Sequence, residues 1–160
     1  MRKEEGSREQ GTGSRKNAYR MSVRRTKLWG MAGEVRIRKQ IVERMVGEAK
    51  RTPAEECCGL LAGRESVITE IFPARNALAS ATEFEIAPAE LFRIFRAMRE
   101  AGLEHLGIYH SHPRGPEVPS PRDIERAFYP EAAYFVLSPA GVKGFVIREG
   151  KVEELGIKIE

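Results

Sequence analysis

The run Glu56–Gly63, with the sequence ECCGLLAG, is the feature that most restricts the fold of this chain. Small and apolar residues fill the run without polar alternation, and glycine closes it. This pattern is typical of a strand buried inside a sheet. The segment Ser66–Phe72 follows almost directly and also has strand character, so we expect the two segments to pair as a hairpin.

Two longer segments have helical periodicity. Lys39–Arg51 is predicted to be an amphipathic helix that ends before Pro53, and a second helix is expected from Pro88 to about Glu100. The apolar stripe of the first helix contains Ile41, Val42, Met45, Val46 and Ala49. We expect further strands at 35–37, 105–111, 133–137, 142–148 and 152–159, an extended segment at 84–86, and a short helix from Ser120 to about Phe128. Strands mixed with two substantial helices predict an α/β (α+β) domain with one mixed sheet.

A chain of 160 residues is long enough for one ordinary domain. Its 27 basic residues outnumber its 23 acidic ones, but residues 1–30 alone carry nine basic and three acidic side chains. We interpret residues 1–30 as a disordered basic tail, which a true start at Met21 or Met31 would shorten or remove, and residues 31–160 as the folded domain. A basic arm that contacts nucleic acid or an acidic partner is the alternative.

The remaining composition predicts the compartment. No stretch reaches the roughly 18 consecutive apolar residues that a membrane span needs, and no apolar segment follows the basic start as in a secretory signal. The two cysteines, Cys57 and Cys58, are adjacent, and neighbouring cysteines rarely reach the geometry of a disulfide. We therefore expect a cytoplasmic protein without a membrane partner. Scarce amides beside abundant Glu and Arg favour a thermophilic source.

The chemistry is concentrated in the motif His110-Ser-His112, which is followed after seven residues by Ser120-x-x-Asp123. Two histidines at positions i and i+2 of a strand point to the same face, so both imidazoles can bind one ion. A carboxylate from the start of the next helix completes a three-ligand set. Two His and one Asp with a fourth position open to water suit catalytic Zn²⁺, which lowers the pKa of water toward about 7.

Each half of this motif also has a simpler explanation. A lone His-x-His on a strand is more often surface decoration or a satisfied polar pair. Ser120 and Asp123 around Pro121 are an ordinary helix start, with the serine as N-cap and the aspartate closing a capping box. We expect this capping geometry in either case, because a carboxylate has lone pairs for both tasks. The joint spacing favours the metal, since a chance match is on the order of one in ten thousand.

Glu56 is the candidate general base. Hydrolysis at a metal needs a carboxylate near the reacting water that is not itself a ligand. A glutamate that enters an apolar strand is unusual, because a buried carboxylate is costly without a partner. The alternative is a solvated charge beside Glu55 at the strand entrance.

The motif residues resemble a known family. His110-Ser-His112-Pro113 with Ser120-x-x-Asp123 resembles the JAMM signature of the MPN-domain metalloproteases, and Glu56–Gly63 is similar to the upstream glutamate motif of that family. The resemblance covers residue 33 to the C-terminus. Asn76, FEIAP at 84–88 and YFVLS at 134–138 fit it as well. The short chain is similar to the prokaryotic and archaeal single-domain branch of deubiquitinase-like enzymes.

The resemblance implies a fold and a set of roles. The fold is a single MPN/JAMM domain in which a curved mixed sheet is flanked by helices, similar to cytidine deaminases. In the metalloprotease, His110, His112 and Asp123 hold one Zn²⁺. Glu56 takes a proton from the zinc water and passes it to the leaving amine, and Ser120 hydrogen-bonds the tetrahedral oxyanion. Cys57 and Cys58 are expected to be small buried strand residues and not ligands.

The resemblance also implies a substrate class. The expected activity is a zinc-dependent isopeptidase or peptidase that cleaves after the Gly-Gly tail of a ubiquitin-like or sulfur-carrier protein. A tail without side chains can enter a narrow cleft and pair with an edge strand, and we expect the cleft walls at 76–86 and 113–119. Two alternatives remain. One is a non-catalytic MPN interaction module. The other is a RadC-like DNA-associated protein, which ranks third because residues 1–30 lack helical apolar periodicity.

Overall fold

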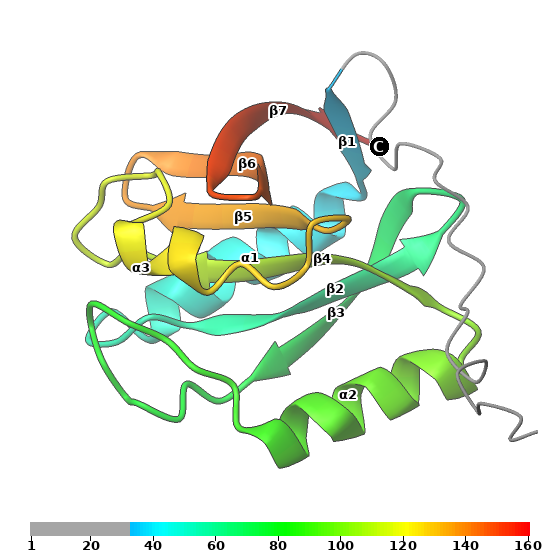
Figure 1. The fold of residues 1–160 in the computed structure, drawn as a ribbon, viewed down its shortest axis with the longest axis horizontal. Coiled ribbons are helices and arrows are strands. Elements are labelled where there is room, and N and C mark those ends of the chain that lie inside the picture. The colour runs from blue at the N-terminus through cyan, green and yellow to red at the C-terminus, as the bar shows by residue number, and fades with distance from the viewer. Residues whose placement is uncertain (1–32) are drawn as a thin grey trace, which may run out of the picture.

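The computed structural model describes residues 33–160, so the expectations for residues 1–30 lie outside the described residues. Three helices are interspersed among seven strands in this part of the chain, and the last three strands follow one another directly (Figure 1). In chain order they are β1 (Glu34–Ile37), α1 (Lys39–Arg51), β2 (Cys58–Arg64), β3 (Val67–Ala74), α2 (Pro88–Glu100), β4 (Glu104–Ser111), α3 (Pro121–Glu125), β5 (Ala133–Ser138), β6 (Gly141–Arg148) and β7 (Lys151–Ile159). Within 33–160, no helix is long and apolar enough to cross a membrane.

The seven strands form one mixed sheet, which confirms the predicted fold class. The strand order is β1-β3-β2-β4-β5-β6-β7, and β7 pairs in parallel with β1, so the sheet closes into a barrel. Strands β4 and β5 also run parallel, while β2 is antiparallel to both β3 and β4. The closing contact between β1 and β3 covers only Val67 and Ile68, so the rest of β3 is paired on one side, with β2, and the expected pairing of a substrate tail with an edge strand stays a prediction.

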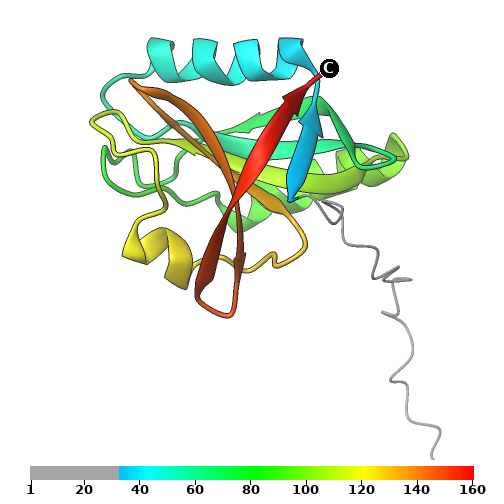
Figure 2. The ribbon, with the colours of Figure 1, turned by 90° about the horizontal axis from the view of Figure 1, so that it is seen from above.

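The two long helices cover opposite sides of the sheet. Helix α1 lies along one side of the barrel (Figure 2), where Ile41 and Met45 join a buried cluster that includes Leu61 of β2. Helix α2 packs Ile94 onto a second cluster that includes Leu60. Neighbouring residues of β2 therefore point into two different cores. This explains why the strand is apolar without alternation, as expected for a strand buried on both faces.

Close packing brings β2 and β4 together beneath the site. A Cβ atom added at Gly59 would lie 2.5 Å from the ring of Tyr109 and 2.6 Å from the carbonyl oxygen of Phe72, so only glycine fits between these neighbours. The register pairs Cys58 with His110. Cys58 of β2 and Cys57 just before it are both buried, and neither forms a disulfide, as expected.

One local expectation differs from the structure, because the short helix α3 ends at Glu125 instead of continuing to Phe128. Residues 84–86, which were expected to be extended, form no helix and no strand of the sheet. The segment 84–86 is extended, but its hydrogen bonds go to its own loop, where the Ala77 N–H donates to the Glu85 carbonyl at 2.8 Å.

Candidate active site

Three side-chain atoms converge at one end of β4. Nε2 of His110 lies 3.0 Å from Nε2 of His112, and each of these nitrogens lies 3.1 Å from Oδ2 of Asp123. Zinc bonds of 2.0–2.1 Å in a tetrahedron separate neighbouring ligand atoms by about 3.3 Å. The three atoms therefore lie nearly as far apart as three corners of a zinc tetrahedron, and this donor set suits a divalent ion.

The fold places these groups from three directions. His110 lies in the central strand β4, between Cys58 of β2 and Val136 of β5. His112 follows the end of β4, where its N–H donates to the carbonyl of Leu137 at 2.7 Å. Both imidazoles point the same way, as the i, i+2 spacing predicts. The carboxylate arrives separately, from the first turn of α3.

The start of α3 orients Asp123. The hydroxyl of Ser120 accepts a hydrogen bond from the Asp123 N–H at 3.1 Å, and the Ser120 N–H donates to Asp123 Oδ2 at 2.7 Å. This is the capping box that the sequence predicts, with Pro121 in the first turn. In the described chain, no acceptor bonds the hydroxyl hydrogen of Ser120, so the cap leaves this donor free.

Electrostatics in the cluster favour a cation between its members. Burial alone would raise the pKa of Asp123, but hydrogen bonds from His110 and His112 together hold it well below its usual range. Burial lowers the pKa of His110, which keeps that imidazole neutral. The pKa of His112 is raised, because its bonds to Asp123 and the Pro116 carbonyl outweigh the opposing effect of burial.

Glu56 is buried beside this cluster. Its side chain is 3% exposed, and its Oε1 lies 3.8 Å from His112 Nε2. The alternative of a solvated charge at the strand entrance is therefore wrong. Burial raises the pKa of Glu56 to about 7, although His112 lowers it in part. Glu56 Oε2 has no hydrogen-bond partner among residues 33–160. A carboxylate near half-ionisation at neutral pH can both accept and return a proton.

A groove of about 400 Å³ opens over His110 and Asp123. One wall is formed by residues 82–86, where the ring of Phe84 stacks on His110 with centroids 4.6 Å apart. The other wall contains Arg122 and the segment 126–129. The predicted groove wall at 76–86 is confirmed for residues 82–86. The other predicted wall, the loop 113–119, does not line this groove. Arg122 of α3 and Arg126 just after it lie at that wall instead.

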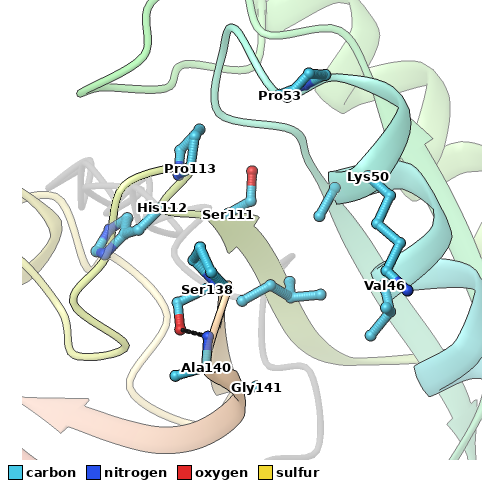
Figure 3. Close-up of a pocket in the computed structure, with 12 residues that line it drawn as sticks. Val46, Lys50, Pro53, Ser111, His112, Pro113, Ser138, Ala140 and Gly141 are labelled. Atoms are coloured by element: carbon cyan, nitrogen blue, oxygen red, sulfur yellow. Dashed lines mark hydrogen bonds between the residues drawn. The ribbon is translucent and has the colours of Figure 1, made fainter.

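A hollow of about 500 Å³ lies on the other side of β4, between α1 and the turn from β5 to β6 (Figure 3). Apolar residues line most of it, including Val46 and Leu137. The close-up shows the imidazole of His112 turned away from Val46 and Lys50. Of the candidate site residues, His110 and Asp123 line the groove and His112 lines this hollow, while Glu56 and Ser120 line neither.

Two sets of contacts at the groove were not predicted, although Asn76 was named as fitting the family pattern. Salt bridges join its walls, from Arg122 to Glu83 at 2.9 Å and from Arg126 to Glu85 at 3.6 Å. Asn76 is 3% exposed and bonds to the backbone of the loop that forms the first wall. The sequence offered a weak signal for Asn76, one of only two asparagines, but none for its partners.

Comparisons with known proteins show the family of this chain. Residues 38–149 match the family described as prokaryotic homologs of the JAB domain. The chain is 38% identical over 102 residues to a probable TtuB-protein conjugate cleaving protease of Thermus thermophilus, which covers 63% of this chain and 68% of the relative. It is 32% identical over 130 residues to a CysO-cysteine peptidase of Mycobacterium tuberculosis, covering 77% and 89% of the two chains.

A solved structure is also similar. A protein of Desulfitobacterium hafniense, whose structure was determined in solution, superimposes with a TM-score of 0.72 at 31% sequence identity. The superposition covers 79% of this chain and 92% of the other. The arrangement of barrel and helices is therefore shared over nearly the whole of that protein.

Proposed function

This chain belongs to the family of prokaryotic homologs of the JAB domain, and from that premise we propose that it is a zinc-dependent isopeptidase or peptidase that cleaves after the Gly-Gly tail of a ubiquitin-like or sulfur-carrier protein. One observation carries the proposal: three ligand atoms 3.0–3.1 Å apart lie beside a buried glutamate, and two of their residues, His110 and Asp123, line a groove. This is the arrangement that metal-assisted hydrolysis needs.

The proposed zinc ligands are His110, His112 and Asp123. Their atoms fit the ion in identity and in spacing, and the carboxylate brings the negative charge that balances it. When bound, zinc polarises a peptide carbonyl and makes water acidic near neutral pH. In our proposal Glu56 is not a ligand, because it is the group that must remain free to exchange a proton.

Glu56 is proposed to move the proton. Hydrolysis adds water across the C–N bond, so one proton leaves the attacking water and one must reach the departing amine. A carboxylate with a pKa of about 7 suits both transfers, because neither its acid nor its base form is strongly favoured at neutral pH. Its burial also keeps bulk water from competing for that proton.

Ser120 is proposed to stabilise the oxyanion. Its hydroxyl oxygen already accepts from the Asp123 N–H, which fixes the side chain at the start of α3. The remaining hydroxyl hydrogen can donate to the negative oxygen that develops on the scissile carbonyl. Capping and catalysis thus use different ends of one hydroxyl group, and one does not exclude the other.

The extended segment 84–86 offers a template for the substrate tail. The main-chain groups of Glu85 point toward residues 76 and 77 of the same loop. The Glu85 N–H donates to Asn76 Oδ1 at 3.3 Å, and the Glu85 carbonyl accepts from the Ala77 N–H at 2.8 Å. Successive peptide groups of an extended chain point in opposite directions, so those of Phe84 and Ile86 face away from the loop. In the described chain they have no partner. A glycine tail could pair with them as an added strand and pass beneath both walls without side-chain clashes.

The names of the relatives support the choice of partner. One is named for cleavage of TtuB-protein conjugates and another as a CysO-cysteine peptidase. We propose that this chain likewise acts on a small carrier protein, either conjugated to lysine or extended at its C-terminus. We also propose that it works in the cytoplasm, since free buried Cys57 and Cys58 suit a reducing compartment.

The test is intact-mass analysis of candidate ubiquitin-like proteins, each fused through Gly-Gly to a short extension, before and after incubation with the enzyme. The proposal expects a single cut directly after Gly-Gly. It expects a much higher kcat/KM for the folded fusion than for a free peptide with the same junction, because the partner's body supplies binding energy that orients the bond. Cleavage elsewhere, or no cleavage by zinc-loaded protein, would refute the assignment. DNA binding without hydrolysis would instead favour the RadC-like alternative.

A further inference from the structure

The backbone of Glu56 is held by a loop and not by the sheet. Glu56 lies outside β2, which begins at Cys58. Its N–H donates to the carbonyl of Ser80 at 2.8 Å, and its carbonyl accepts from Asn76 Nδ2 at 3.1 Å. The same amide nitrogen donates to the carbonyl of Glu83 at 2.9 Å, with a longer contact to Ser80 at 3.3 Å. Asn76 therefore joins the candidate base to the groove wall.

The other end of the Asn76 side chain shapes that wall. Its Oδ1 accepts from the N–H of Leu78 at 3.1 Å and from the N–H of Glu85 at 3.3 Å. The second bond turns the Glu85 peptide inward, which leaves the main chain of Phe84 and Ile86 facing outward. Asn76 is 3% exposed, and both ends of its amide are bonded, so its orientation is fixed.

We propose that Asn76 is a positioning residue for peptide-bond cleavage. Through its donor end it sets the place of the Glu56 carboxylate beside His112, and through its acceptor end it presents the main chain of 84–86 to the substrate tail. The catalytic half of this inference rests on the proposed function. If Asn76 only closed the loop and stabilised the fold, its loss would lower the melting temperature without a selective fall in kcat.

The activity test separates the two ends of the amide. Asn76→Asp keeps the acceptor oxygen and removes the donor, so we expect kcat to fall about 10²-fold with a much smaller change in KM. Asn76→Ala removes both ends and should also raise KM. Zinc content should stay at one per chain in both variants. As a control, Tyr109→Phe loses a 2.6 Å hydrogen bond to Glu48 on the α1 side, and should lower the melting temperature without changing kcat. An unchanged kcat in Asn76→Asp would overturn the proposal.

A second measurement needs neither a variant nor a substrate. In the unaltered protein, amide hydrogen exchange should be slow at Glu56 and Glu85 and fast at Phe84 and Ile86, because only the first two N–H groups are bonded within the described chain. Equal exchange at Glu85 and Ile86 would overturn the template role. If exchange follows the expected pattern but the wild-type protein cleaves no Gly-Gly fusion, the proposed function fails while the loop geometry stands.

Discussion

The carbonyl oxygen of Pro116 lies 2.6 Å from Nδ1 of His112. A carbonyl can only accept, so Nδ1 carries a hydrogen, and in the neutral ring the lone pair of Nε2 would be available to a metal ion held together with His110 and Asp123. Hydrogen bonds of this kind orient metal-binding histidines. The contact explains how the 113–119 loop serves the site without lining the groove.

The first prediction concerns the metal. The purified protein should retain one zinc per chain after dialysis, as measured by elemental analysis. Asp123→Asn keeps the shape of the side chain and an oxygen for the Ser120 N–H, but it removes the only anionic ligand, so the zinc content should fall to near zero. His110→Ala and His112→Ala should do the same. Full zinc in all three variants would show that the ion binds elsewhere.

The second prediction concerns proton transfer. Glu56→Gln should keep zinc but lower kcat by roughly 10²–10⁴-fold, because an amide of nearly equal shape cannot accept the proton. Glu55→Gln is the matched control, since it removes the same charge from the neighbouring, more exposed residue and should leave kcat unchanged. Kinetics with a folded Gly-Gly fusion give both values. Equal rates for Glu56→Gln and the wild type would remove Glu56 from the mechanism.

The third prediction separates the two roles of Ser120. Ser120→Ala removes the cap of α3, at a cost of about 1 kcal/mol of unfolding free energy. It should also lower kcat by about 10²–10³-fold if the hydroxyl donates to the oxyanion. Ser120→Thr keeps the hydroxyl and should lose little of either. A change confined to the melting temperature of Ser120→Ala would leave the serine as a cap alone.

The fourth prediction is a pH dependence of stability that arises at His105. Burial lowers the pKa of His105 to about 4, although its hydrogen bond to the Gly107 carbonyl opposes the shift. The unfolded side chain titrates near 6.5. Above that pH the ring is neutral in both states. Between about 6.5 and 4 the unfolded chain binds a proton that the folded chain does not, so stability falls with falling pH, by up to about 3 kcal/mol.

Urea denaturation at pH 7.5 and pH 4.5 measures this loss. His105→Gln cannot bind the proton and should lose less stability over the same interval. Acid also affects the zinc ligands, but it does so in both proteins, so the difference between the two pH dependences isolates His105. Parallel pH dependences would show that another group causes the acid sensitivity.

Sequence patterns predicted the parts of the fold that depend on residues close together in the chain. The bounds of α1 and α2 follow from apolar periodicity and from prolines that end or begin a helix, and both are confirmed. The juxtaposition of His110 and His112 follows from strand alternation. The orientation of Asp123 was predicted from the helix start, because a capping box fixes the side chain at the third helical position.

Closure of the barrel could not be predicted in this way. It depends on pairing between Glu34 and Gly156, which lie at opposite ends of the described chain, and no local pattern encodes that contact. The role of Asn76 was missed for the same reason. Its side chain bonds to the backbone of residues from 20 positions earlier to nine positions later, and backbone groups have no sequence signature.

The last prediction concerns residues 1–32. Strand β1 begins at Glu34 and has both of its neighbours, β3 and β7, within the described chain. The Gly156 N–H donates to the Gly33 carbonyl at 2.8 Å, so the barrel is already closed from Gly33 onward. A protein that begins at Met31 therefore keeps every strand, both cores and all the proposed site residues. It should match the full chain in zinc content, melting temperature and kcat on a folded Gly-Gly fusion. Lower kcat/KM with an unchanged melting temperature would assign the first 30 residues to substrate binding, and insolubility would contradict the domain boundary at residue 31.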